Sequence, residues 1–233
     1  MANTPVVVLD DTLTNIANAI RGKNGSSDKY KPGQMANAID NISAGGTGIP
    51  REIIDGVYKI PEATSFSLPS NATNVGKYAL AYAFYSCPSL TSVDLSSLTK
   101  VSGEAAFYEA FYNCTALTSV DLSSLTTLSG RNALASAFDV CTALTSVEFS
   151  SLTTVSGYHA LYNTFSRCNS LTSLSFPALT VSGLQYGSSQ FDNMLYGVTG
   201  CTVHFPAAVK AKIEATSGYP NFGGTNTTVL FDL

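Results

Sequence analysis

Charged side chains are scarce in this sequence: Asp, Glu, Lys and Arg together make up 12% of its 233 residues. The formal net charge is −4 and no basic run occurs, which argues against nucleic acid as a partner. No apolar stretch approaches the roughly 20 residues that a membrane helix needs, so we expect no membrane insertion. The apolar run from Val6 to Leu9 lacks a basic start and is too short for a signal-peptide core. We therefore expect neither a secretion signal nor an anchor.

Recognisable catalytic motifs are also missing. The sequence has no P-loop, no dinucleotide-binding fingerprint, no His-Glu-x-x-His motif and no Gly-x-Ser-x-Gly motif. Its two histidines, His159 and His204, have no nucleophile and acid at a recognisable spacing. These absences predict a protein that is not an enzyme, with no catalytic residues, no metal and no cofactor.

What the sequence does have is an internal repeat of 27 residues. Units that recur at a constant period of this size stack into solenoids, because one unit cannot bury its apolar face alone. Cysteine, phenylalanine and leucine keep one register over four units, and the last glycine arrives one residue early. The repeated positions are Cys87, Cys114, Cys141 and Cys168; Phe84, Phe111, Phe138 and Phe165; Leu90, Leu117, Leu144 and Leu171; and Gly103, Gly130, Gly157 and Gly183.

Each unit is predicted to contain a strand, a loop and a helical turn. The alternation at Val93–Leu95 predicts a short strand with Asp94 turned away from the core. Gly103–Asn113 is rich in Ala, Phe and Tyr, which favours a short helical turn. We therefore predict an α/β solenoid of 27-residue units, with strands on one face and helical turns on the other. The expected strands are Phe66–Leu68, Val93–Leu95, Val120–Leu122, Val147–Phe149, Leu174–Phe176 and Val203–Phe205.

The repeated segment AFYNCTALTSVDLSSLTTLSG resembles the BspA-type leucine-rich repeat of bacterial surface proteins, over roughly residues 60–205. The segment CTVHFPAAVKAKIEA resembles the closing turn that follows such arrays. This chain has Ser-Ser after most strands where the family often has proline. The resemblance implies a leucine-rich-repeat solenoid, to which we assign residues 49–233.

Both ends of a solenoid need a cap, because the last repeat would otherwise expose apolar side chains. At the C-terminal end, Pro206 suits the first turn of a helix on which Val209 and Ile213 share a face. A final strand at Thr228–Phe231 would complete the cover. At the other end, residues 53–60 are expected to form an entry strand or cap.

The N-terminal segment differs in kind from the repeats. Two apolar stripes at helical spacing predict two short helices, joined as a hairpin in residues 1–48 that attaches to a partner or forms oligomers. The stripe residues are Leu13, Ile16, Ile20, Met35, Ile39 and Ile42. The segment LTNIANAIRGKNGSSDKYKPGQMANAIDNI also resembles a module of phage and prophage tail and other structural proteins. That resemblance implies attachment to phage structural proteins.

The repeated cysteines are expected to form a ladder in the solenoid. Neighbouring repeats would bring their Cα atoms within reach of a disulfide, but five cysteines cannot all pair. A straight ladder also does not converge on a metal ion. We predict buried free thiols that act as small apolar groups, Cys201 included.

Two sets of side chains are candidates for ligand binding. The strand face offers a polar strip that could bind sugar hydroxyls, a peptide or calcium, or could be a solvated surface. Its residues are Ser92, Asp94, Ser119, Asp121, Ser146, Glu148, Ser173 and Ser175. The helical-turn face offers tyrosines that serve either as binding anchors or as packing between neighbouring turns. They are Tyr82, Tyr85, Tyr108, Tyr112, Tyr158 and Tyr162.

These features predict a non-enzymatic binding protein of a phage or prophage tail or virion, assembled in the bacterial cytoplasm. Its solenoid would recognise a host-surface protein or polysaccharide, and homo-oligomers would raise the avidity. The alternative is a bacterial cell-surface or secreted leucine-rich-repeat adhesin. A hydrolase is the least favoured class, because a regular ladder of carboxylates offers no cleft and no asymmetric acid pair.

Overall fold

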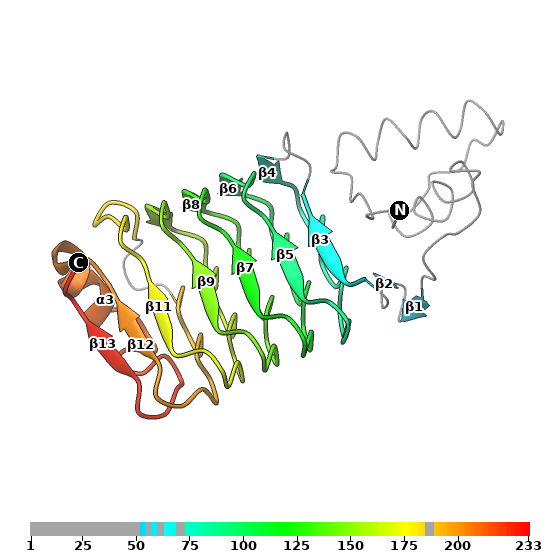
Figure 1. The fold of residues 1–233 in the computed structure, drawn as a ribbon. Coiled ribbons are helices and arrows are strands. Elements are labelled where there is room, and N and C mark those ends of the chain that lie inside the picture. Colours follow the sequence, from blue (N-terminus) through cyan, green and yellow to red (C-terminus); the bar gives the residue numbers. More distant parts are fainter. Residues whose placement is uncertain (1–51, 55–56, 60–62, 69–72, 185–188) are drawn as a thin grey trace.

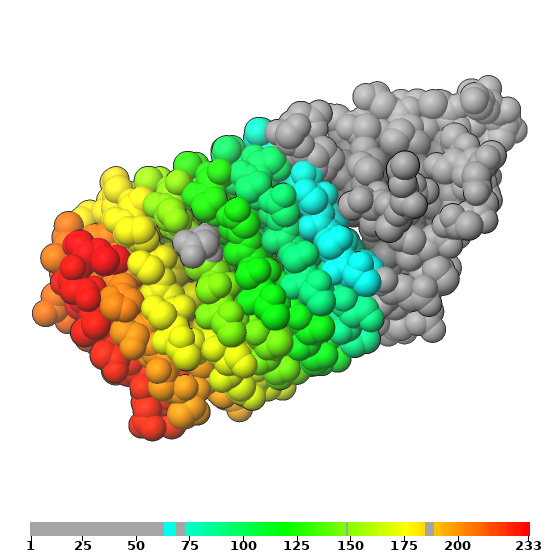
Figure 2. All heavy atoms as spheres, in the orientation of Figure 1, coloured from blue at the N-terminus to red at the C-terminus, as the bar shows by residue number. Residues whose placement is uncertain are grey.

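Residues 52–54, 57–59, 63–68, 73–184 and 189–233 are described by the structure, a computed structural model. The repeats stack side by side into an elongated solenoid that runs from β3 to β13 (Figure 1). We call each stacked repeat a rung. In a space-filling view the rungs form successive bands across the molecule (Figure 2). The predicted solenoid is therefore confirmed, although its internal structure differs from the expected one.

The first face of the solenoid, here called the strand face, is built from parallel strands. β3 (Ser65–Ser67), β5 (Ser92–Asp94), β7 (Ser119–Asp121) and β9 (Ser146–Glu148) form one sheet. β11 (Ser173–Ser175), β12 (Thr202–His204) and β13 (Thr228–Leu230) form a second, and β11 lies beside β9. Each strand that follows the repeat begins one residue earlier than predicted, and its central residue points inward. In β5 this residue is Val93, which is buried between two exposed neighbours.

Another parallel sheet, here called the short-strand sheet, lies where the sequence predicted only a loop. It consists of the two-residue strands β4 (Asn74–Val75), β6 (Lys100–Val101), β8 (Thr127–Leu128) and β10 (Thr154–Val155). The second residue of each strand is fully buried. Two residues are too few to produce a recognisable alternation, which is why these strands could not be predicted from the sequence.

The remaining face of the solenoid, here called the turn face, is built from consecutive turns and not from the predicted helical turns. Gly103–Asn113 is a run of consecutive turns in which every fourth residue has a positive φ angle. This four-residue repeat is close to the 3.6-residue period of a helix, so it places apolar residues at the same spacing. The positive-φ residues are Tyr78, Tyr82 and Ser86, then Ala105, Glu109 and Asn113, then Asn132, Ser136 and Val140, and then His159, Asn163 and Arg167.

Backbone hydrogen bonds explain why turns replace a helix here. The N–H of Tyr82 donates to the carbonyl of Tyr108 in the next rung, over 2.9 Å. The N–H of Tyr85 instead donates to the carbonyl of Tyr82 within its own rung, over 3.2 Å. Along this segment, successive N–H groups alternate between donating to a carbonyl of the next rung and closing a turn within their own rung. An α-helix would use its interior N–H groups internally and leave none to connect the stack.

Apolar side chains fill the interior as columns that run along the stack. The phenylalanines of the repeat are buried and nearly parallel, with centroids 5.3, 5.2 and 5.8 Å apart from Phe84 to Phe165. The repeated leucines, Leu90, Leu117, Leu144 and Leu171, are also buried. Stacked rings lose their water-exposed faces to identical neighbours, so each rung supplies the cover that the next one needs.

The ends of the described solenoid carry the expected kinds of element. β1 (Glu52–Ile54) and β2 (Val57–Lys59) pair as an antiparallel hairpin before the first rung. At the other end a 3-10 helix (η1, Ala207–Val209) leads into α3 (Lys210–Glu214), and Val209 and Ile213 are buried as predicted. β13 pairs in parallel with β12, which confirms the final strand.

Val140 is poorly suited to its backbone conformation. Its φ is +62°, a left-handed value that is strongly disfavoured for a β-branched residue, whereas Asn113 occupies the equivalent place one rung earlier. We expect Val140→Asn to raise the free energy of unfolding by about 1 kcal/mol. Chemical denaturation would measure the change, with Val140→Ala as a control that removes only the branching. A less stable Val140→Asn protein would contradict the assignment of strain to this residue.

Candidate recognition surfaces

The predicted polar strip lies on the strand face, as expected from the alternation. Ser92, Ser119 and Ser146 are exposed and paired in register, and Ser173 begins β11 in the same way. Asp94 pairs with Asp121, whose Cα is in turn paired with that of Glu148. Ser175 is in register with His204. The structure therefore brings these predicted residues onto one surface.

The aspartates of this strip have a structural task that the sequence did not suggest. One carboxylate oxygen of Asp94 accepts the backbone N–H of Ser96 over 2.9 Å, and Asp121 accepts that of Ser123 over the same distance. Such bonds stabilise the turn that follows the strand. Hydrogen bonds from the Ser96 hydroxyl and then its N–H hold the pKa of Asp94 below its usual value. The aspartates that end β5 and β7 are thus explained without a ligand.

Two further ladders of threonine hydroxyls fasten the corners of the rungs. At one corner, Thr118 Oγ1 donates to the Thr91 carbonyl over 3.3 Å, and Thr145 repeats the bond one rung later. At the other corner, Thr126 Oγ1 donates to the Thr99 carbonyl over 2.8 Å, and Thr153 continues the series. These hydroxyls join rungs, so the threonine-rich composition serves the stack.

The predicted tyrosines lie on the turn face and contact one another between rungs. Tyr82 meets Tyr108 edge-on at 5.4 Å, and Tyr85 stacks on Tyr112 at 4.7 Å. Burial is the main cause that raises the pKa of the Tyr108 phenol. Further along, the His159 ring lies between Tyr158 and Tyr162, with centroid distances of 3.9 and 4.8 Å. These tyrosines pack on neighbouring rings and are half-buried, except for Tyr158, which is exposed.

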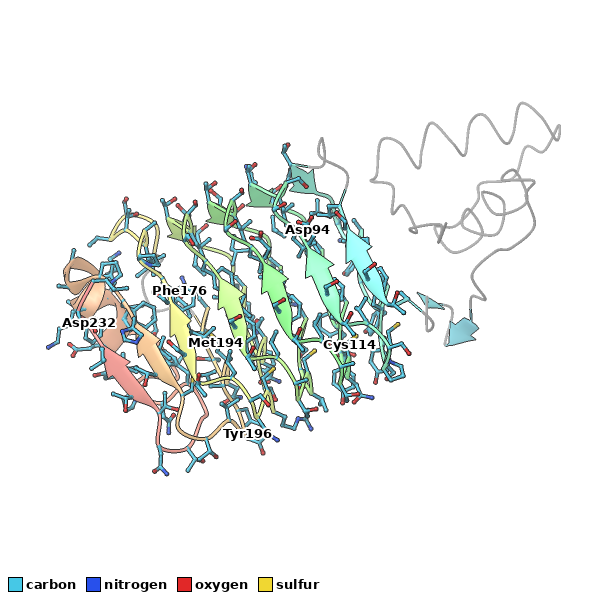
Figure 3. All side chains as sticks on the ribbon, in the orientation of Figure 1. Asp94, Cys114, Phe176, Met194, Tyr196 and Asp232 are labelled. Atoms are coloured by element: carbon cyan, nitrogen blue, oxygen red, sulfur yellow. The ribbon has the colours of Figure 1, made fainter. Side chains whose placement is uncertain are left out.

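Among the described residues, three tyrosines are largely exposed, and they lie on different rungs. The exposed fraction is 53% for Tyr78, 48% for Tyr158 and 56% for Tyr196. Two of them have a cation near the ring, Lys77 at 5.0 Å from Tyr78 and Arg131 at 5.5 Å from Tyr158. In the view of Figure 3, Tyr196 lies near the lower edge of the molecule, and Asp94 near the upper end of its strand. Aromatic side chains therefore reach the surface along much of the turn face.

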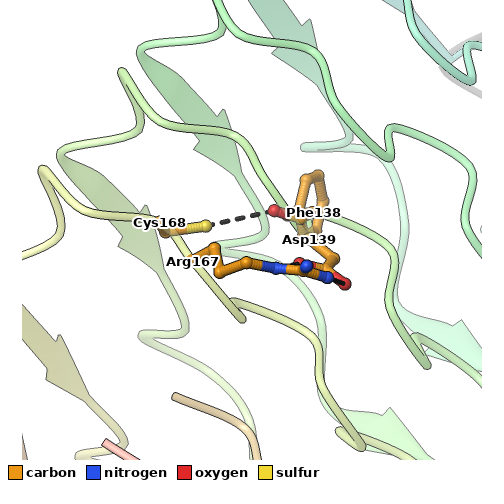
Figure 4. A network of polar contacts seen from close by, with 4 residues as sticks. All are labelled: Phe138, Asp139, Arg167 and Cys168. Atoms are coloured by element: carbon orange, nitrogen blue, oxygen red, sulfur yellow. Dashed lines mark hydrogen bonds and ion pairs between the residues drawn. The ribbon is translucent and has the colours of Figure 1, made fainter. Parts of the chain in front are cut away.

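One ion pair on the turn face was not predicted. Arg167 donates from Nε to Oδ1 of Asp139 over 3.1 Å and from Nη2 to Oδ2 over 2.8 Å (Figure 4). The Asp139 side chain is only 5% exposed, whereas that of Arg167 is 48% exposed. Asp139 occupies the place that Tyr112 has one rung earlier. This replacement of a recurring tyrosine by an aspartate was the sequence feature that could have indicated the ion pair.

The cysteines are free and buried, which confirms the prediction. Cys114, Cys141 and Cys168 each donate a thiol hydrogen bond over 3.1 Å to the carbonyl of the phenylalanine in the preceding rung. The cysteine position therefore supplies a weak link between rungs as well as an apolar group. Figure 4 shows the bond from Cys168 to Phe138.

Native thiols are expected not to react. Burial raises the pKa of Cys141 to about 12 and that of Cys201 to about 11, so neither forms appreciable thiolate at pH 8. The pKa of Cys168 is also raised by burial, and that of Cys114 mainly by its hydrogen bond with Cys87. A colorimetric thiol titration should detect five cysteines in denaturant and none in the native protein within minutes. Rapid labelling of the native protein would contradict this burial.

The attachment residues, Leu13, Ile16, Ile20, Met35, Ile39 and Ile42, lie outside the described residues. Within the described part, no three His, Cys, Asp or Glu side chains form a group able to hold a metal ion. In the same part of the chain, no helix is both long and apolar enough to cross a membrane.

Comparisons with known proteins bear on the family. No curated protein sequence matches the chain. A crystal structure of a leucine-rich repeat protein from Bacteroides ovatus ATCC 8483, at 1.19 Å resolution, is similar with 16% identity and a TM-score of 0.29. The match covers 74% of this chain and 53% of that one, so this chain spans about half of that protein's length. The family described as "BspA type Leucine rich repeat region" matches residues 51–194 in six copies. The chain therefore belongs to the BspA-type leucine-rich-repeat family.

Proposed function

We propose that the chain is a non-enzymatic recognition protein whose solenoid binds a protein or polysaccharide on a host surface. The observation that carries this proposal is the row of exposed tyrosines, Tyr78, Tyr158 and Tyr196, spread over separate rungs. Tyrosine combines a large contact area with a hydroxyl that can form hydrogen bonds, and it is enriched in binding sites. Leucine-rich-repeat solenoids offer extended surfaces of this kind.

Binding can be tested with the fluorescently labelled full chain on intact host cells. We expect saturable binding that falls by about tenfold when Tyr78, Tyr158 and Tyr196 are all replaced by serine. The matched control replaces three exposed serines of the strand face, Ser92, Ser119 and Ser146, by alanine. Loss of binding in the control alone would move the site to the strand face. Absence of saturable binding to host cells would contradict the proposal.

The proposed setting is a phage or prophage tail or virion, to which the N-terminal segment attaches the solenoid. Support comes from the resemblance of residues 13–42 to a module of phage structural proteins. Phage particles purified by sedimentation should contain the full chain, and Ile16→Asp with Ile39→Asp should remove it from them. Tyr196→Ser should leave particle association unchanged, because it alters only the solenoid surface.

Membership of the BspA-type family favours a second candidate, a bacterial surface or secreted adhesin. The two candidates differ in where the chain is found. An adhesin would be recovered from the bacterial surface or medium of cells that carry no phage particles. A genomic neighbourhood of tail genes, in contrast, would favour the phage setting.

A further inference from the structure

The ion pair between Arg167 and Asp139 holds a guanidinium in place at the surface. Its two hydrogen bonds, of 3.1 and 2.8 Å, use Nε and Nη2 and leave Nη1 outside the pair. The carboxylate beneath is buried, while the arginine side chain is 48% exposed. A planar group fixed by a bidentate bond loses little conformational entropy when a ligand binds.

Tyrosines border this guanidinium from both directions along the stack. Tyr85 and Tyr112 occupy the two rungs before Asp139 and stack at 4.7 Å with an interplanar angle of 13°. On the following rung, the carbonyl of Tyr196 accepts the N–H of Arg167 over 2.7 Å. The hydrogen-bonded Asp139 is the main cause that raises the pKa of Arg167, and the Tyr112 and Tyr196 phenols act in the same direction.

We call Tyr85, Tyr112, Arg167 and Tyr196 the arginine corner. Its single positive charge is already matched by Asp139, so neither a free anion nor a cation gains strong electrostatic attraction there. What the corner offers instead is planar aromatic surface, phenolic hydroxyls and guanidinium N–H groups. This combination suits a pyranose ring, whose C–H face packs on an aromatic ring while its hydroxyls form hydrogen bonds.

Building on the function proposed above, we infer that the arginine corner binds an uncharged glycan chain laid along the solenoid axis. From the rung of Tyr85 to that of Tyr196 there are five rungs, a distance of about 19 Å at the usual strand spacing. A single sugar is much shorter than this distance. Affinity therefore increases with the number of linked sugars until the corner is filled.

A glycan array probed with the labelled full chain tests this inference. The array carries neutral oligosaccharides of increasing length together with sialylated and uronate-containing ones. We expect binding to a subset of neutral glycans, with Tyr196→Ala weakening it by about tenfold. Ser119→Ala is the matched control, since it alters an exposed residue of the strand face and leaves the array signal unchanged.

Arg167→Lys provides a second variant that keeps the charge above Asp139 but loses the planar bidentate geometry. It should also weaken binding to the neutral glycans, and its circular dichroism and unfolding midpoint check that the chain is folded. Binding confined to acidic glycans, or to no neutral glycan, overturns the inference. If Tyr196→Ala and Arg167→Lys bind host cells as the unaltered chain does, the arginine corner is not the site, and the proposed function stands without it.

Discussion

Gly130→Ala is expected to lower the free energy of unfolding by about 3 kcal/mol, one of the largest effects of any single methyl group in this chain. A Cβ at residue 130 would lie 2.1 Å from the carbonyl oxygen and 2.8 Å from the carbonyl carbon of Gly103. Both atoms belong to the backbone of the preceding rung, so no side chain can move aside. The rungs must separate at this point, and the hydrogen bonds beside it would lengthen.

Gly200→Ala is the control for this prediction. Gly200 has a φ of +75°, but a Cβ there would have no heavy atom within 4 Å. The substitution therefore adds only the cost of a left-handed alanine, about 1 kcal/mol. Denaturant unfolding curves of the two variants compare steric contact with backbone conformation directly. Equal losses of stability would show that the close approach of the Gly103 backbone to residue 130 does not destabilise the alanine variant.

Phe138→Ala should be still more destabilising, by about 4 kcal/mol. The ring is fully buried in the middle of the phenylalanine column, 5.2 Å from Phe111 and 5.8 Å from Phe165. Its removal leaves a cavity between two rungs and exposes the faces of both neighbouring rings. The surrounding backbone is tied to adjacent rungs by hydrogen bonds, so it cannot collapse into the space.

The variant Phe138→Leu, which keeps most of the apolar volume, separates cavity formation from loss of the ring contact. We expect a loss of about 1 kcal/mol for this change, because most of the apolar volume remains. Thermal and chemical denaturation followed by circular dichroism measure both variants. A Phe138→Ala protein as stable as Phe138→Leu would mean that the column is not continuous at this rung.

The solenoid and its core could be predicted from the sequence because the repeat is a global signal. A leucine or phenylalanine that returns every 27 residues needs the same neighbours in every rung, and stacking is the arrangement that supplies them. The turn face could not be predicted in this way. Its pattern at Ala106 and Ala110 fits a helix and a four-residue turn repeat equally well. Only the hydrogen bonds to the next rung decide between them.

The surface residues were predicted in part, and the reason for the gaps is physical. Alternation along a strand determines which side chains point outward, so Ser92 and Asp94 were placed correctly. The bond from Asp94 to Ser96 depends on the turn geometry after the strand, which alternation does not encode. The Arg167–Asp139 pair links residues 28 positions apart, one more than the repeat, so a search in strict register misses it.

The hydrogen bonds that join the rungs have a mechanical consequence. They occur on the strand face, in the short-strand sheet and along the turn face. Tension applied at the two ends of the stack therefore acts on the boundaries between rungs, which separate one after another. Detachment of one rung frees 27 residues, about 90 Å of extended chain. A molecule with this construction lengthens in steps under shear, and the rungs that stay folded keep their surfaces intact.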